Sequence, residues 1–186
     1  MQIEATRKLF TVDEYHRMAV AGVLGPGDRV ELIDGEVIQM SAIGARHLGC
    51  VNRIIDLFAA TFRGRAVVSP QHPVRLDDYN EPQPDLALLE MRPDFYASKV
   101  PSSRDALLVI EVSDTTLRYD RDVKLPLYAA AGIPEFWIAD LDAGVLRVYR
   151  APSGREYAAN VVLGRDDAVS VLAFPDVAFR VGELLG

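Results

Sequence analysis

The longest helical pattern in the sequence spans residues 46 to 62. Its apolar side chains recur every three or four positions, which places them on one face of an α-helix. The members of this face are Val51, Ile54, Ile55, Phe58 and Phe62. The segment therefore predicts an amphipathic helix whose apolar face packs against a core.

A shorter helix is predicted near the start of the chain. Thr11 and Glu14 have the spacing of a capping box, in which each side chain accepts a hydrogen bond from the backbone amide of the other residue. The helix that follows is expected to end at Gly22 or within the Gly25-Pro26-Gly27 turn, because glycine readily ends a helix.

A β-hairpin is predicted next, over residues 29–33 and 36–40. Asp34 and Gly35 separate these two stretches and supply the positive φ angles of a tight type I′ turn. Side chains alternate between the faces of a strand, so Glu31 is expected on the face opposite Val30 and Leu32.

The middle of the chain consists of short apolar runs bounded by Pro, Asp, Asn or Ser, which is typical of strands. These predicted strands are residues 66–69, 74–76, 85–89 and 107–112. Residues 91–106 predict a long surface connection. A further helix is expected to run towards Ala131, but Pro126 requires that it either begin near Lys124 or bend there, because a proline beyond the first turn kinks a helix.

The C-terminal third predicts mainly strands. A hairpin is expected at residues 136–141 and 145–150, followed by strand-like pieces around Val161 and Val169 and a terminal apolar segment at 181–185. Strands and helices thus mix along the chain, without an internal repeat or a linker. We predict one domain over residues 1–186, with an α/β (α+β) fold: a mixed β-sheet flanked by helices.

Composition and charge narrow the class of protein. The 186 residues are 49% apolar and 25% charged, as in a globular domain. The net charge is −7, from 27 acidic and 20 basic side chains. This charge argues against a protein that holds nucleic acid by sequence-independent attraction alone. It is compatible with a nucleic-acid enzyme whose acidic residues hold metal ions, because the ions attract phosphate.

The cysteine count and the lack of a membrane or secretory segment predict a cytoplasmic protein. Cys50 is the single cysteine, so neither an internal disulfide nor a cysteine metal cage can form, which suits a reducing compartment. No uninterrupted apolar stretch is long enough for a bilayer, and residues 1–10 are too charged for a secretory signal. We therefore expect no membrane partner.

Two acids occur where buried strands are predicted. Asp85 opens the apolar run 85–89, and Glu111 lies near the end of the run 107–112. A carboxylate in such a place must be paired, protonated or bound to metal. If the two strands are neighbours, Asp85 and Glu111 can meet at one edge of the sheet and offer oxygen ligands suited to Mg²⁺ or Mn²⁺.

Lys124 is the candidate cationic group. It lies four positions after Asp120 and four before Tyr128, so the three share one face of a helix. A lysine beside a bound metal ion could orient the attacking water or stabilise charge on the phosphate.

These acids and Lys124 resemble the motifs of a known family. The pattern consists of Pro84-Asp85, Glu111-Val112-Ser113, Asp120, Lys124, Tyr128 and residues 132–140, and it extends back through residues 11–15 and 30–36. In order and spacing it resembles the Uma-two family of restriction endonucleases, which belongs to the PD-(D/E)XK nuclease superfamily. The resemblance implies a restriction-endonuclease-like core and a Mg²⁺-dependent endonuclease that acts on DNA.

The resemblance also implies roles for four residues. Asp85 and Glu111 would be the metal-binding acids, Glu31 a further acid at the metal, and Lys124 the lysine of the superfamily. The position two after Glu111 is Ser113 instead of the usual lysine, and the lysine stands on the following helix. By analogy with such nucleases, a homodimer is also expected.

Other interpretations remain open at this stage. The structural alternatives are that Asp85 is a residue at a strand start, Glu31 an exposed hairpin acid and Lys124 part of a solvated helix face. His47 lies near a predicted helix start, where it either touches the site or is a surface histidine. The remaining polar candidates have competing structural roles: Asp120 as a helix N-cap, and Tyr128 and Trp137 as core residues. The alternative functions are a catalytically degenerate binding or regulatory protein on the same fold, and a metal-dependent hydrolase of a small phosphoester.

Overall fold

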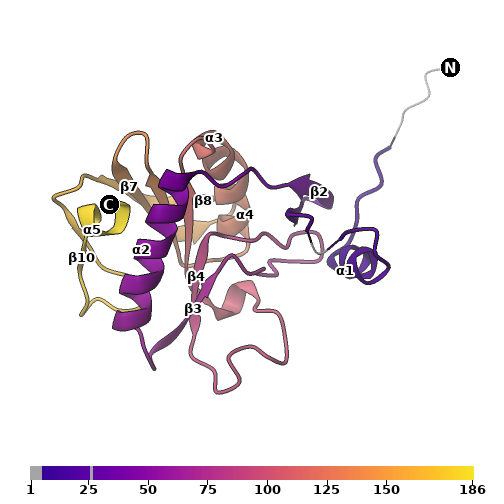
Figure 1. Cartoon of the computed structure of the whole chain (residues 1–186), viewed down its shortest axis with the longest axis horizontal. Helices are drawn as coiled ribbons and strands as arrows, with labels where there is room; N and C mark the ends of the chain where they lie inside the picture. The colour runs from indigo at the N-terminus through magenta and orange to yellow at the C-terminus, as the bar shows by residue number, and fades with distance from the viewer. Residues whose placement is uncertain (1–5, 26) are drawn as a thin grey trace.

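The computed structural model describes residues 6–25 and 27–186, and its centre is a six-stranded sheet (Figure 1). The strands follow one another across the sheet in chain order: β3 (Ala66–Pro70), β4 (Leu86–Glu90), β5 (Ala106–Ser113), β6 (Glu135–Asp140), β7 (Val145–Ser153) and β8 (Glu156–Leu163). Neighbouring strands are antiparallel except β5 and β6, which are parallel. The predicted mixed sheet is confirmed.

Helices cover both faces of this sheet (Figure 1). On one face lie α2 (Ala45–Thr61) and the short C-terminal α5 (Val181–Leu185). On the other lies a run of three short helical pieces: α3 (Leu117–Tyr119), the π-helical η2 (Asp120–Lys124) and α4 (Leu125–Ala130). The expected architecture, a sheet flanked by helices, is therefore confirmed.

The alternation of side chains in β5 explains where the polar site can form. Leu108, Ile110 and Val112 belong to the core beneath α2. Val109 belongs to the core beneath α4, and Glu111, two residues further, points to the same face. The acid of β5 is thus directed towards the irregular helical run and not towards α2.

The N-terminal elements form a separate unit beside the sheet (Figure 1). Helix α1 (Val12–Val20) begins with the predicted capping box, and β1 (Val30–Ile33) pairs with β2 (Glu36–Gln39) in the predicted hairpin. Asp34 and Gly35 have φ angles of 48° and 73°, as the type I′ turn requires. Pro26, expected in the turn after α1, lies outside the described residues.

Gly35 also allows the hairpin to pack closely against the chain that precedes α1. A Cβ at this position would lie 2.7 Å from the Cβ of Leu9, so no other residue fits without displacing the backbone. The hairpin is further held by pairing of Leu32 with Glu81 and by a hydrogen bond from the Asp34 amide to Asn80 Oδ1. These contacts fix β1, and with it Glu31, against the segment that leads into β4.

One sequence prediction needs correction here. Residues 74–76 do not form a strand: Arg75 makes an isolated bridge to Ser102, because the segment runs beside the 91–106 connection instead of joining the sheet. That connection contains turns and a short 3₁₀ helix, η1 (Ser103–Asp105). The terminal segment 181–185 is the helix α5, and it follows a small two-stranded sheet of β9 (Ala168–Val169) and β10 (Phe179–Arg180).

Candidate functional site

The pairing of β4 with β5 brings two predicted site acids together. Leu86 lies opposite Ile110, so Asp85, just before β4, is beside Glu111 and Val112. The Val112 amide donates a hydrogen bond of 2.8 Å to Asp85 Oδ2, and the Asp85 amide donates a longer one of 3.4 Å to Glu111 Oε2. Asp85 and Glu111 are both buried. The prediction that these acids meet at one edge of the sheet is confirmed.

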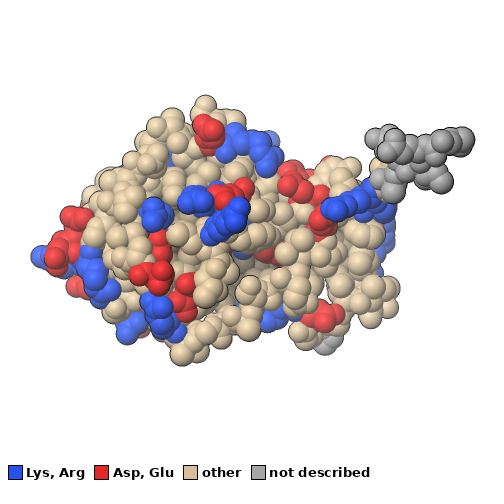
Figure 2. Space-filling view, turned by 90° about the horizontal axis from the view of Figure 1, so that it is seen from above, with Lys and Arg blue, Asp and Glu red and all other residues tan. Residues whose placement is uncertain are grey.

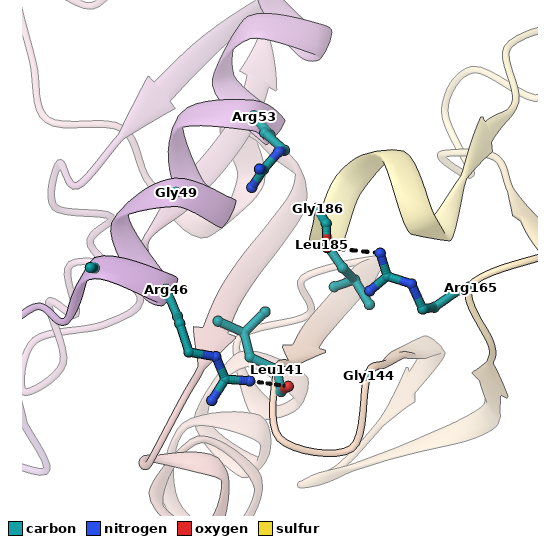
Figure 3. A pocket seen from close by; sticks show the side chains of 9 residues that line it. Arg46, Gly49, Arg53, Leu141, Gly144, Arg165, Leu185 and Gly186 are labelled. Carbon is teal, nitrogen blue, oxygen red and sulfur yellow. Dashed lines mark hydrogen bonds between the residues drawn. The ribbon is translucent and has the colours of Figure 1, made fainter.

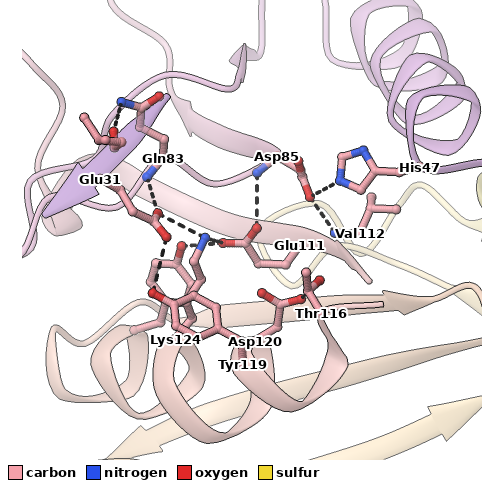
Figure 4. Close-up of polar contacts among 12 residues, drawn as sticks. Glu31, His47, Gln83, Asp85, Glu111, Val112, Thr116, Tyr119, Asp120 and Lys124 are labelled. Carbon is pink, nitrogen blue, oxygen red and sulfur yellow. Dashed lines mark hydrogen bonds and ion pairs between the residues drawn. The ribbon is translucent and has the colours of Figure 1, made fainter. Parts of the chain in front are cut away.

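Lys124 approaches Glu111 from the helical run that packs on this face of the sheet (Figure 4), and Tyr128 reaches it from the same run. Lys124 Nζ lies 3.0 Å from Glu111 Oε1, and the Tyr128 hydroxyl donates a 2.7 Å hydrogen bond to the same oxygen. The four-residue spacing thus brings both side chains to one carboxylate. Tyr128 is also a core residue, as predicted, but its hydroxyl contact with Glu111 was not anticipated.

Glu31 reaches the same lysine from the N-terminal hairpin. Its Oε2 lies 3.1 Å from Lys124 Nζ and accepts a 3.1 Å hydrogen bond from the Gln83 amide. Its Oε1 accepts a 3.5 Å hydrogen bond from the Tyr119 hydroxyl. Glu31 is 2% exposed, which excludes the interpretation as an exposed hairpin acid.

The π-helical turn determines where Lys124 points. In η2 the Leu125 amide donates to the Asp120 carbonyl, five residues earlier, so this turn is wider than an α-helical one. Pro126 follows in the first turn of α4, where its missing amide is tolerated. Of the two geometries considered from the sequence, α4 begins beside Lys124, and a π-helical turn precedes it.

His47 lies on the other side of Asp85. It belongs to the first turn of α2, and its Nε2 is 2.9 Å from Asp85 Oδ2. Its Nδ1 is buried and has no hydrogen-bond partner among the described residues. The interpretation as a surface histidine is wrong. The alternative, that His47 touches the candidate site, agrees with this contact, but its partner Asp85 was not predicted because the contact depends on how α2 packs against β4.

Asp120 has a role different from the predicted helix N-cap. It follows α3 directly, and its Oδ2 accepts hydrogen bonds of 2.7 Å from the hydroxyls of Ser113 and Thr116. Ser113, at the position where the superfamily pattern has lysine, is therefore used to hold Asp120. The contact links the end of β5 to the start of η2.

Burial and charge shift the pKa values of this cluster. Burial raises the pKa of Glu111 to about 8, although the Lys124 ammonium opposes the shift. Burial lowers the pKa of Lys124, but Glu111 and Glu31 outweigh it and hold this pKa above its ordinary value. Burial also raises the pKa values of Asp120 and Tyr128. Lys124 is therefore a charged lysine among acids, and a strongly perturbed cluster of this kind is typical of a functional site.

The cluster lines a cleft of about 860 Å³. The cleft lies between the segment after β2 and the helical run, and its lining includes Glu31, His47, Asp85, Glu111 and Lys124. A volume of this size is in the range of small-molecule sites and could also receive part of a polymer.

The cleft holds no complete protein cage for a metal ion. Among the described residues, no three His, Cys, Asp or Glu side chains are arranged to hold one. Two oxygens are nevertheless available. Within the described part of the chain, no group donates to Asp85 Oδ1, and Glu111 Oε2 accepts only the long bond from the Asp85 amide. Mg²⁺ commonly binds one or two carboxylates and completes its shell with water and substrate, so these two acids fit it.

A second hollow, of about 410 Å³, lies beside the first turn of α2 (Figure 3). Its lining includes Arg46, Arg53 and Arg165. Arg46 donates to the Leu141 carbonyl and pairs with Asp114, and Arg165 donates to the Gly186 carbonyl. Because these two guanidinium groups are already engaged, the acidic cleft is the better candidate site.

The surface does not show a large basic area on the face viewed in Figure 2. Lys and Arg side chains there are interspersed with Asp and Glu. This distribution agrees with the net charge of −7. Within the described residues, no helix combines the length and the apolar character needed to cross a bilayer.

The mixed sheet with helices on both faces is a restriction-endonuclease-like fold. A family model described as "Putative restriction endonuclease" matches residues 12–182, and the chain belongs to this family, Uma2. The structure is similar to a solved structure from Anabaena variabilis ATCC 29413, described as "a putative nuclease belonging to DUF820", with a TM-score of 0.71. That match covers 95% of this chain and 97% of the other at 16% identity, so it supports the fold alone. Among curated proteins, none matches the sequence significantly.

Proposed function

We propose that this chain is a nuclease that hydrolyses DNA phosphodiester bonds with the help of Mg²⁺ or Mn²⁺. Membership of the Uma2 family and the restriction-endonuclease-like fold support a nuclease. The DNA substrate, the divalent metal and the catalytic residues go beyond this support and are proposed.

One observation carries the proposal: the buried cluster contains more acids than cations. Glu31, Glu111 and Asp120 lie around a single lysine, Lys124, among the described residues, and Asp85 lies beside Glu111. A buried carboxylate is costly unless it is paired, protonated or bound to metal, and without a cation burial raises the pKa of Glu111 to about 8, so that Glu111 takes up a proton more readily. A divalent cation would supply the missing positive charge, and it would do so next to an open cleft.

In this proposal Asp85 and Glu111 would hold the cation. A bound cation of this kind lowers the pKa of a water molecule and neutralises charge on the scissile phosphate. One oxygen of each carboxylate is already fixed, Asp85 Oδ2 by the Val112 amide and Glu111 Oε1 by Lys124 and Tyr128. The protein thus orients both carboxylates before the cation arrives.

Lys124 has the role of placing positive charge beside the reacting water and phosphate. Its ammonium is held by Glu111 and Glu31, which keep it protonated. A protonated lysine can orient the water and stabilise a developing negative charge, but it cannot act as a base. Glu31 contributes by holding Lys124. A contact of Glu31 with the cation stays a prediction. In the structure Glu31 Oε2 already contacts Lys124 and the Gln83 amide.

The test is relaxation of supercoiled plasmid by the purified protein in Mg²⁺ or Mn²⁺, with chelator controls. We expect metal-dependent nicking that is lost in Asp85→Ala, Glu111→Ala and Lys124→Ala. The matched control is Lys99→Ala, because Lys99 pairs with Asp105 on the surface and lies outside the cleft. Circular dichroism of each variant separates loss of activity from loss of the fold.

The other outcomes identify the alternatives. Mn²⁺ binding measured by calorimetry, without plasmid nicking, would contradict the DNA substrate and favour a small phosphoester, which a chromogenic phosphodiester would then test. Absence of both Mn²⁺ binding and nicking would contradict the enzyme and favour a degenerate site on the same fold. The predicted homodimer is tested separately, by light scattering of the purified protein.

A further inference from the structure

The start of helix α2 lacks the features that normally stabilise a helix start. Its N-cap is Gly44, which makes no side-chain capping bond, and its first turn contains no acid. It contains Arg46 and His47 instead. Helix α1 of the same chain has a full capping box and two acids in its first turn. A cationic group such as Arg46 is unfavourable at the positive end of the helix dipole, so its presence in α2 calls for another explanation.

Acids from other elements supply what α2 lacks. Arg46 pairs with Asp114 at 2.8 Å, and His47 Nε2 lies 2.9 Å from Asp85 Oδ2. Both acids line the same cleft as Glu111 and Lys124. The first turn of α2 is therefore shaped to meet the candidate site, at the expense of its own capping.

The contacts of Asp85 define which nitrogen of His47 is the donor. Asp85 Oδ2 accepts from the Val112 amide and faces Nε2, so Nε2 carries the proton and donates the second hydrogen bond to this oxygen (Figure 4). Nδ1 is then left as an acceptor, and it is buried with no partner among the described residues. An unsatisfied buried nitrogen costs stability, which a residue present only for packing would avoid.

We propose that His47 is a positioning residue, which fixes Asp85 Oδ2 by hydrogen bonding so that Asp85 Oδ1 is presented to a divalent cation. The inference rests on the proposed function, because it assigns Asp85 to the cation. His47 does not itself bind the cation, since Nε2 is engaged with Asp85 and Nδ1 is enclosed in protein. Partners of this kind orient a metal ligand and determine its affinity.

The experiment compares His47→Ala and His47→Gln with the wild-type chain. The glutamine side-chain amide can place an N–H donor close to the position of Nε2, whereas alanine removes the donor. The control is His72→Ala, because His72 is exposed, contacts Ser69 and lies outside the acidic cleft. The affinity for Mn²⁺ is measured by calorimetry without DNA, and thermal unfolding is followed by circular dichroism.

We expect His47→Ala to weaken Mn²⁺ binding by about 10- to 100-fold, as for other residues that orient a metal ligand. His47→Gln should restore most of the affinity, and His72→Ala should leave it unchanged. In plasmid nicking, the Mn²⁺ concentration for half-maximal rate should rise in His47→Ala, while the rate at saturating Mn²⁺ largely recovers. A residue that only stabilises the fold would not raise the required Mn²⁺ concentration while leaving the rate at saturating Mn²⁺ largely unchanged.

Several results would overturn the inference. Wild-type affinity in His47→Ala would do so, and so would equal weakening in His47→Gln and His47→Ala. If His47→Ala does not fold, His47→Asn replaces it, because its amide cannot reach as far as Nε2. Equal affinity in the Asn and Gln variants would then contradict the inference.

The outcome for the wild-type chain keeps the two proposals distinguishable. Mn²⁺ binding without DNA cleavage would remove the proposed reaction and leave the affinity comparison valid. Absence of Mn²⁺ binding by the wild-type chain would overturn both proposals. Normal binding and cleavage by both the wild-type chain and His47→Ala would overturn only the role of His47.

Discussion

The two helical segments that pack on opposite faces of the sheet contribute to the site in different ways. Helix α2 is a regular helix of 17 residues whose buried side chains belong to the main core, and only its first turn reaches the cleft. The run 117–130 is divided into α3, η2 and α4, and it directs both Lys124 and Tyr128 at Glu111. One segment mainly packs the core, and the other carries two side chains of the candidate site.

The difference shows what irregular structure provides. A regular amphipathic helix separates an apolar face from a polar one, so a buried polar group fits it poorly. The π-helical turn widens the helix locally at Asp120–Lys124, and both of these end residues are buried. Such turns are frequently found at functional sites. The four predictions below test whether the two segments are as different as their structures indicate.

The largest effect is expected for Lys124→Met. It would leave Glu31 and Glu111 buried without their cation, and removing one partner of a buried ion pair costs about 3–5 kcal/mol. We expect loss of detectable nicking together with a drop of this size in the free energy of unfolding, measured in urea. A variant with unchanged stability and activity would show that the helical run is not the site.

The opposite pattern, a loss of stability without a loss of activity, is expected for Ile54→Ala in α2. Ile54 is buried in the main core, and shortening such a side chain typically costs about 2–5 kcal/mol. The nicking rate per folded molecule should change less than about twofold, because Ile54 does not line the cleft. A large loss of activity at temperatures where the variant is fully folded would contradict the role of α2 as scaffold.

Tyr128→Phe should have a smaller effect on stability and a distinct effect on activity. Losing the hydroxyl removes one donor to Glu111 Oε1, at a cost of about 1 kcal/mol. Activity should fall by about 10- to 100-fold at limiting Mn²⁺, because Glu111 is held less firmly. Tyr157→Phe is the matched control: its hydroxyl donates to the Ile133 carbonyl, away from the acids. Equal activity in the two variants would contradict the role given to Tyr128.

The smallest effect is expected for Pro126→Ala. Pro126 lies in the first turn of α4, where its missing amide costs little, so stability should change by less than about 1 kcal/mol. Nicking should stay within a few-fold of wild type if contacts of Asp120 and Lys124 maintain the π-helical turn. A large loss of activity with unchanged stability would instead show that Pro126 maintains the π-helical turn.

The same contrast explains what could be predicted from the sequence. The helix that became α2 was predicted within one residue at each end, because its apolar periodicity is regular. The hairpin turn was predicted from Asp34 and Gly35, whose backbone preferences are local. Asp85 and Glu111 could be identified as partners because acids in apolar strands need compensation.

The remaining features depend on tertiary packing. The contact of His47 with Asp85 depends on how α2 packs against the sheet, and the residues that neighbour His47 in the sequence do not indicate this packing. The hydroxyl contact of Tyr128 was hidden because a tyrosine at helical spacing also fits a core. Residues 74–76 have the composition of a strand, but their backbone is engaged elsewhere: the Val74 and Leu76 amides donate to the carbonyls of Pro82 and Asn80, and Arg75 forms only an isolated bridge.

The single parallel pair in the sheet has a consequence for where a nuclease lysine can be located. Strands β5 and β6 are parallel, so the chain must return across the sheet before β6 can start, and such a return usually contains a helix. In this chain the return is the run 117–130, which passes over the face to which Glu111 points. The topology therefore allows two positions for one ammonium group: on the strand beside the acid, or on the crossover that passes over the acid. In this chain the strand position is Ser113, which contacts Asp120, and the ammonium group that reaches Glu111 is that of Lys124 on the crossover.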